Sequence, residues 1–238
     1  REHIRLRREL LAKFTLVSVL AGPLALAAYG AANIRRVRLK ENVVKFPHLP
    51  PQMDGLRFVQ ITDLHVGQSI RREFVQEVVD LCNSADADFC ALTGDILDAP
   101  LESIAHHASP LKDIKTKWGS FFVTGNHEYS WGGDAAIEFL QGLGVTALIE
   151  DGRHVDVNGA RLLIAGVSDH QANRRHPTHR SSPEEAMRGR RADFNLLLAH
   201  RPDSAEGAQQ AGFDYMFAGH THAGQFFPVN FIVHLVHK

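Results

Sequence analysis

Five short polar motifs hold the side chains whose types could carry out chemistry. They span residues 63–65, 94–98, 125–128, 199–202 and 219–222, and they read Asp-Leu-His, Gly-Asp-Ile-Leu-Asp, Gly-Asn-His-Glu, Ala-His-Arg-Pro and Gly-His-Thr-His. Their pool of His, Asp and Asn, without cysteine, suits borderline divalent ions such as Mn, Fe or Zn. Fifteen histidines in a chain of 238 residues also indicate metal or acid–base chemistry.

The position of these motifs favours convergence on one centre. Each motif follows a short apolar run, where the pattern predicts a buried strand. Asp63 and His65, like His220 and His222, are two residues apart, so that both members of a pair point the same way in an extended backbone. Ligands of open α/β sheets bind at the carboxyl ends of the strands. Loops spread over 160 residues can therefore meet at one edge of a sheet.

Apolar runs and helical periodicity alternate along the chain after residue 55. The pattern predicts strands or apolar runs at 56–61, 89–92, 121–124, 145–149, 154–157, 162–167, 194–199 and 213–217, and helices at 71–84, 101–114, 134–143 and 204–211. Helices that alternate with strands predict an α/β domain whose strands are mostly parallel.

The charges of the motifs predict the kind of substrate. Two divalent ions, two aspartates and a bridging hydroxide would leave a net charge of about +1. Such a centre attracts a phosphate monoester or diester. Two metal ions also activate a bridging water and stabilise the charge on the attacked phosphoryl group.

The amino-terminal segment predicts a membrane helix. Residues 14–34 carry no formal charge over 21 positions, which as a helix would span about 31 Å, close to one hydrocarbon core. We therefore divide the chain into a basic flank at 1–13, a transmembrane helix or signal anchor at 14–34, a linker at 35–55 and a catalytic domain at 56–238. A cleaved secretion signal and a buried helix of a soluble domain are the alternatives.

Charge also bears on topology and on partners. Each flank of the segment holds five Lys or Arg residues, at 1–13 and at 35–45. We take the arginines at 5, 7 and 8 to favour a cytoplasmic amino terminus and a domain outside the cytoplasm. The formal net charge of the whole chain is −1, so the chain lacks the overall excess of basic residues that is typical of nucleic-acid-binding proteins.

The composition excludes two classes of protein. A chain that is 44% hydrophobic and 22% charged is not disordered throughout, and two cysteines cannot form a disulfide framework.

The motifs together resemble the calcineurin-like metallophosphoesterase superfamily over roughly residues 54–228. The stretches ITDLHVG, TGNHEYSWGG, LLIAGVSDH, LLLAHRP and GHTHAGQFFP are similar to its membrane-associated bacterial subgroup, which includes the transmembrane proteins with a metallophosphoesterase domain. The resemblance implies a two-sheet αββα sandwich preceded by one transmembrane helix. Only residues 223–238 follow the last motif, so we expect the domain to be truncated at its C-terminus and the second sheet to lack strands.

The same resemblance implies a role for each motif residue. One metal ion would take Asp63, His65, Asp95 and His222, and the other Asp95, Asn126, His200 and His220, with Asp95 shared. His127 would face the scissile phosphate without binding metal, and Asp98 would orient it. For Glu128 the resemblance gives no definite role, and support of its loop is one option.

One departure narrows the substrate class. The protein Ser/Thr phosphatases of the superfamily have Arg-Gly after the last aspartate of the second motif, where this chain has Ala99-Pro100. This difference argues against a phosphoprotein phosphatase.

We therefore expect a membrane-anchored, extracytoplasmic phosphohydrolase or phosphodiesterase that uses two divalent ions and a metal-bridging hydroxide. Its phosphate-ester substrate would be lipid-linked, sugar-linked or a nucleotide-derived diester. The alternatives are a UDP-sugar-lipid pyrophosphatase of lipid A type and a non-catalytic, membrane-tethered metal-binding module. The His- and Arg-rich segment 168–182 either grips an anionic headgroup or forms a solvated loop.

Overall fold

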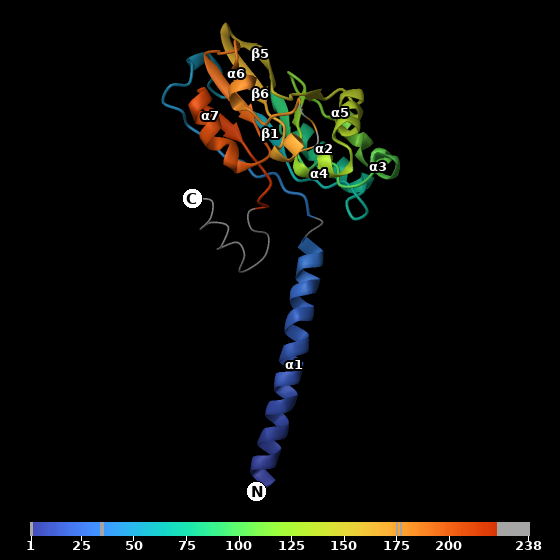
Figure 1. Cartoon of the computed structure of the whole chain (residues 1–238). Coiled ribbons are helices and arrows are strands. Elements are labelled where there is room, and N and C mark those ends of the chain that lie inside the picture. The colour runs from blue at the N-terminus through green and yellow to red at the C-terminus, as the bar shows by residue number, and fades with distance from the viewer. Residues whose placement is uncertain (1, 34–35, 175, 177, 223–238) are drawn as a thin grey trace. The chain divides into compact units, whose positions relative to one another are not determined.

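The computed structural model describes residues 2–33, 36–174, 176 and 178–222, and it divides into two compact units, residues 1–39 and 40–238. The first unit is one helix, α1, at Glu2–Asn33 (Figure 1). Its stretch His3–Gly30 has a mean hydropathy of 1.9 over its most apolar window and is long and apolar enough to cross a membrane. This stretch covers all but the end of the predicted segment 14–34, and residue 34 lies outside the described residues.

The second unit begins with a parallel sheet of four strands. They are β1 (Phe58–Ile61), β2 (Phe89–Thr93), β3 (Ser120–Val123) and β4 (Thr146–Ala147), and they lie side by side in that order. The connecting helices are α2 (Arg72–Ser84), α3 (Leu101–Ala108), α4 (Asn126–Trp131) and α5 (Gly133–Gly142). Short 3-10 turns, η1 (Pro51–Met53) and η2 (Ser109–Asp113), precede β1 and follow α3.

A second sheet contains the other four strands. Strand β5 (Asp151–Val157) pairs antiparallel with β6 (Ala160–Gly166), and β7 (Phe194–Leu198) and β8 (Tyr215–Phe217) continue in parallel. The Asn158-Gly159 turn joins β5 to β6 with φ of 54° and 92°, as a tight hairpin requires. Helices α6 (Pro183–Met187) and α7 (Ala205–Ala211) and the 3-10 turns η3 (His170–Arg174) and η4 (Pro202–Ser204) complete this half.

Three apolar cores hold the layers together. The middle core joins the facing sides of the two sheets through residues such as Phe89, Leu162 and Leu198. A second core packs α2, α3 and α5 on the first sheet, and a third packs α6 and α7 on the second sheet. Figure 1 shows these two groups of helices on opposite sides of the domain. The predicted two-sheet αββα sandwich is confirmed.

The structure adds elements that periodicity did not predict. Helices α4 and α6 have only six and five residues, which is too short for a helical repeat to be recognised. Within the segment interpreted as a linker, Met53 is fully buried and Phe46 and Leu49 pack against the middle core. The expected loss of strands after the last motif falls on residues 223–238, which lie outside the described residues.

Candidate metal centre

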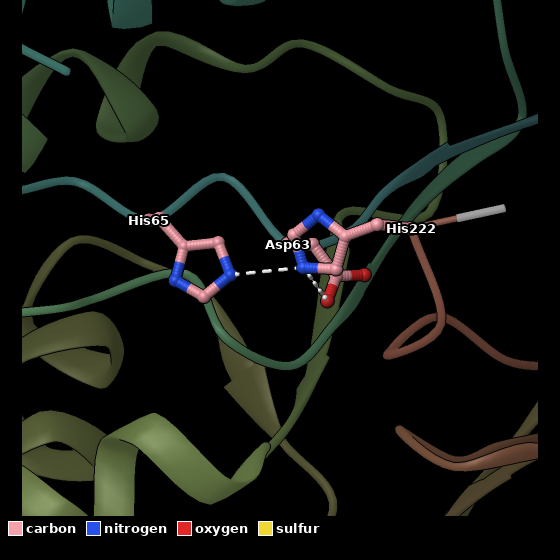
Figure 2. Close-up of side chains that lie close together, drawn as sticks. All are labelled: Asp63, His65 and His222. Carbon is pink, nitrogen blue, oxygen red and sulfur yellow. Dashed lines mark hydrogen bonds and ion pairs between the residues drawn. The ribbon is translucent and has the colours of Figure 1, made fainter. Parts of the chain in front are cut away.

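The first group of predicted ligands comes from the ends of β1 and of β8. His222 Nε2 lies 3.2 Å from Asp63 Oδ1 and 3.3 Å from His65 Nε2. Figure 2 shows the two imidazole rings with a nitrogen of each turned toward the other and the Asp63 carboxylate beside them. The Asp63 carboxylate is itself held, because it accepts hydrogen bonds from the Thr62 hydroxyl (2.6 Å) and from the His220 backbone N–H (2.9 Å).

The second group comes from the ends of β2, β7 and β8. His200 Nε2 lies 3.2 Å from Asp95 Oδ2 and 3.2 Å from His220 Nδ1. Asp95 and His200 are almost completely buried. His200 Nδ1 lies 2.9 Å from the Thr93 carbonyl oxygen, which can only accept, so Nδ1 carries a proton. Loss of the other proton leaves a lone pair on Nε2, directed at Asp95 and His220.

Asp95 lies between the two groups, as a shared ligand would. Its Oδ2 is 3.2 Å from His200 Nε2 and 4.0 Å from His65 Nε2, so the same oxygen faces both groups. Asn126, the first residue of α4, lies beside it, since the next backbone N–H, that of His127, donates to Asp95 Oδ1 at 2.8 Å. All seven predicted metal ligands therefore belong to loops that meet at one edge of the two sheets.

The donor set fits divalent metal ions. Ligands that surround one ion at about 2.1 Å lie roughly 3.0–3.4 Å from one another in octahedral or tetrahedral geometry. The spacings of 3.2 and 3.3 Å between nitrogen and oxygen donors match this range in both groups. Two imidazole nitrogens can face each other at such a distance only if a proton or a cation lies between them, and a metal ion satisfies this requirement.

The backbone is strained where the ligands are attached. Nine residues other than glycine have positive φ in the described part of the chain, and five of them are predicted ligands, with φ between 49° and 69°: Asp63, His65, Asp95, His220 and His222. This left-handed conformation is uncommon outside glycine, and it persists where the surrounding structure imposes it, as at functional sites.

Glycines allow the loops to approach closely. A Cβ on Gly125 would overlap the Asp95 carboxylate, and a Cβ on Gly219 would overlap Asp63 and the Thr62 hydroxyl. Both positions therefore exclude any other residue. The glycines that open three of the motifs, Gly94, Gly125 and Gly219, all serve this close approach.

His127 and Asp98 form the predicted pair. His127 Nδ1 lies 2.5 Å from Asp98 Oδ1, while Nε2 is 3.9 Å from Asp95 Oδ2 and so faces the ligand groups. The same Asp98 oxygen accepts from Trp131 Nε1 at 3.1 Å, and Oδ2 lies 3.3 Å from His65 Nδ1. Asp98 thus orients His127 and lies near a predicted ligand, although His65 Nδ1 forms no hydrogen bond within the described residues. Trp131 holds the Asp98 carboxylate through its Nε1–H. Sequence reasoning missed both contacts, because they join different loops.

Burial and neighbouring charges shift the pKa values of four predicted ligands. Burial opposes the charged form of Asp95, but the hydrogen bond and the charge of His200 outweigh it and lower the pKa of Asp95. Burial also acts against charge on His200, yet Asp95 raises the pKa of His200 to about 8. Burial lowers the pKa of His65 and of His220, which keeps these imidazoles in the neutral form that binds metal.

Glu128 supports two loops, its own and the loop after β2. Its side chain is completely buried and accepts four backbone hydrogen bonds, from the N–H groups of Gly125 (2.7 Å), Ile96 (2.8 Å), Leu97 (2.9 Å) and Asp95 (3.0 Å). Burial raises the pKa of Glu128 to about 6, so the group is ionised at neutral pH. One carboxylate therefore joins the loop after β2 to the loop after β3.

The segment 168–182 packs beside α4. His179 Nδ1 lies 2.8 Å from the Tyr129 hydroxyl, and His176 lies 3.5 Å from Asp134. Asp169, at the start of the segment, is buried and forms an ion pair with Arg201. The segment is thus attached to α4, which carries His127, through His179, to α5 through His176, and to the loop after β7 through Asp169. The predicted contact with an anionic headgroup stays a prediction.

Comparisons with known proteins agree with the motif resemblance. The family model described as Calcineurin-like phosphoesterase matches residues 56–224. A transmembrane protein with metallophosphoesterase domain from Danio rerio is 31% identical over 220 residues, which cover 89% of this chain and 50% of that protein. The protein of the same name from Bos taurus is 34% identical over 200 residues, which cover 79% and 45%.

Among solved structures, the NAD nucleotidase of Haemophilus influenzae is similar in fold, with a TM-score of 0.50 at 13% identity over 70% of this chain and 43% of that chain. At this identity the likeness concerns the fold alone. The chain spans about half the length of the curated relatives it matches.

We predict that Glu128→Gln weakens the whole centre. The amide keeps one acceptor oxygen but turns an NH₂ group toward two of the backbone N–H donors, so the free energy of unfolding should fall by about 2–4 kcal/mol. Metal affinity should fall with it, because Asp95 loses its support. Denaturant unfolding and metal titration measure the two effects. The control is Glu138→Gln on the exposed side of α5, which should change stability by less than about 0.5 kcal/mol; equal results for the two variants would contradict the role of Glu128.

Proposed function

Because the chain belongs to the calcineurin-like phosphoesterase family, we propose that it hydrolyses phosphate esters at a pair of divalent metal ions. The proposed ligands are Asp63, His65, Asp95 and His222 for one ion and Asp95, Asn126, His200 and His220 for the other. The bound ions would activate the attacking water and stabilise charge on the phosphoryl group. The observation that carries the proposal is the position of Asp95, whose Oδ2 faces both donor groups at 3.2 and 4.0 Å.

The chain supplies the acid for the leaving group through His127. Asp98 accepts the Nδ1–H of His127 at 2.5 Å, which directs Nε2 toward the ligand groups. The imidazole keeps 35% of its side-chain surface exposed, so a substrate oxygen can reach Nε2. A protonated Nε2 in this place would donate to the leaving oxygen. This pair favours an enzyme over a metal-binding module without turnover, because a scaffold has no use for an oriented acid that binds no metal.

We further propose that α1 anchors the domain in a membrane, with residues 40–238 outside the cytoplasm. The support is the length and hydropathy of His3–Gly30, the name of the vertebrate relatives and the basic amino-terminal flank. A substrate at the membrane surface, such as a lipid- or sugar-linked phosphate, would suit an enzyme in this place.

A reporter assay tests the topology. β-Lactamase fused after Lys238 should protect bacteria that express the chain from a β-lactam antibiotic, because this enzyme acts outside the cytoplasm. The same fusion without residues 2–33 should give no protection. Resistance that does not require α1, or a full-length fusion without resistance, would contradict the proposed anchor or its orientation.

Metal analysis tests the two-ion centre. The protein loaded with Mn should retain roughly two equivalents after dialysis and should lose its hydrolysis of phosphate esters on chelation. Loading should release protons at pH 7, because the pKa of His200 is about 8 in the metal-free protein and the ligand must be neutral. Affinity should therefore rise with pH up to about 8. Asp95→Asn should weaken both ions, whereas Asp80→Asn, at an exposed position of α2, should weaken neither. Activity that survives without metal would overturn the proposal.

A change of His127 tests its role as an acid. His127→Ala should lower kcat by about 10²–10⁴-fold for an alkyl phosphate ester and leave the metal content unchanged. A p-nitrophenyl ester, whose leaving group needs little protonation, should lose less. The control His106→Ala changes an exposed histidine of α3 and should have no effect. Loss of a metal ion would make His127 a ligand, and equal loss on both esters would place its action on the phosphoryl oxygens.

A further inference from the structure

An ion pair between a half-buried arginine and a buried aspartate lies beside the metal centre, and the chemistry proposed above does not use it. Arg201 directly follows the predicted ligand His200, and its Nε donates to Asp169 Oδ2 at 2.7 Å. Asp169 follows β6 and Arg201 follows β7, two neighbouring parallel strands. The pair therefore lies at the same edge of the second sheet as the donor groups.

Asp169 is held in a single position. Its side chain has no exposed surface, its Oδ1 accepts from the Gln171 backbone N–H at 2.8 Å, and its own backbone N–H donates to the Thr124 hydroxyl at 3.2 Å. Removing a carboxylate and a guanidinium from water costs several kcal/mol per ion, which their attraction does not reliably repay. The pair is therefore not explained by a gain in stability. It is explained by the need to hold the Arg201 guanidinium in one orientation.

The fixed guanidinium reaches the reaction centre. Nη2 of Arg201 donates to Asn126 Oδ1 at 3.3 Å, and Asn126 is a proposed ligand. In the described part of the chain no group accepts from Nη1, and 21% of the Arg201 side-chain surface is exposed. Arg201 thus keeps an N–H group without a partner among the described residues, next to the place where a phosphate would bind. A planar guanidinium matches the oxygens of a phosphate group, on which it can form two parallel hydrogen bonds.

We propose that Arg201 binds the non-bridging oxygens of the substrate phosphate and that Asp169 is the positioning residue that orients it. This inference rests on the proposed function and adds to it a charged contact from the protein to the phosphate. A phosphate monoester carries more negative charge than a diester, so Arg201 should favour monoesters over diesters.

Binding of inorganic phosphate to the Mn-loaded protein tests the inference without turnover. Isothermal titration should show that Arg201→Gln weakens phosphate binding by about 10- to 100-fold, as the loss of a charge-assisted hydrogen bond predicts. Arg201→Lys should weaken it less, since a point charge remains but the second hydrogen bond is lost. Asp169→Asn should also weaken it while the metal content stays unchanged. In kinetics, Arg201→Gln should lose more on a monoester than on a diester.

The matched control is Arg190→Gln, which breaks a surface ion pair with Asp151 (2.8 Å) and should leave phosphate affinity unchanged. Unchanged affinity in Arg201→Gln would overturn the inference, and so would loss of a metal ion in both Arg201 variants, which would make Arg201 a support for Asn126. Both of these variant results are compatible with ester hydrolysis by the wild-type protein, so the proposed function would stand. A wild-type protein that binds two metal ions but no phosphate would contradict both.

Discussion

The buried carboxylate of Glu128 is the interaction on which the metal centre depends. It accepts four backbone N–H groups from two loops that are about 30 residues apart in the sequence. Such N–H groups would otherwise be unpaired in the interior, at a cost of about 1–3 kcal/mol each. By satisfying all four, Glu128 fixes Asp95 against Gly125 and sets the start of α4, where Asn126 and His127 lie.

Without bound metal, this arrangement of the ligands raises the free energy of the folded chain. Five predicted ligands have the left-handed backbone conformation, which costs of order 1–3 kcal/mol at a residue other than glycine. Imidazole nitrogens face one another at 3.2 and 3.3 Å, and in the metal-free protein Asp95 keeps His200 protonated at neutral pH. A bound cation would displace the proton of His200 and relieve the repulsion between the facing nitrogens of His65 and His222. We therefore expect metal binding to contribute to the stability of the domain as well as to its chemistry.

The groups around the ligands act on more than one of them. Asp98 orients the proposed acid His127 by a hydrogen bond and places its negative charge 3.3 Å from the proposed ligand His65. Asp169 holds Arg201 against Asn126 on the other side of the centre. Supporting contacts of this kind fix the rotamers on which a reaction geometry depends. In both cases the anchor is a carboxylate on a different loop from the residue that it orients.

The sequence by itself determined the architecture and the types of residue in the site. Apolar runs followed by Asp, His and Gly show where strands end, and because parallel strands end at one edge, the convergence of His65, Asp95 and His200 was predictable. The helix α1 was predictable for a similar reason, because an uncharged apolar stretch of this length can be recognised from consecutive residues. Only the tertiary structure decided the contacts between loops: the four hydrogen bonds of Glu128, the second contact of Asp98 and the pair of Arg201 with Asp169. These depend on strand order and on backbone torsions, which a linear pattern does not encode. Asp169 and Arg201 are 32 residues apart, and they meet only because β6 and β7 are neighbours in the sheet.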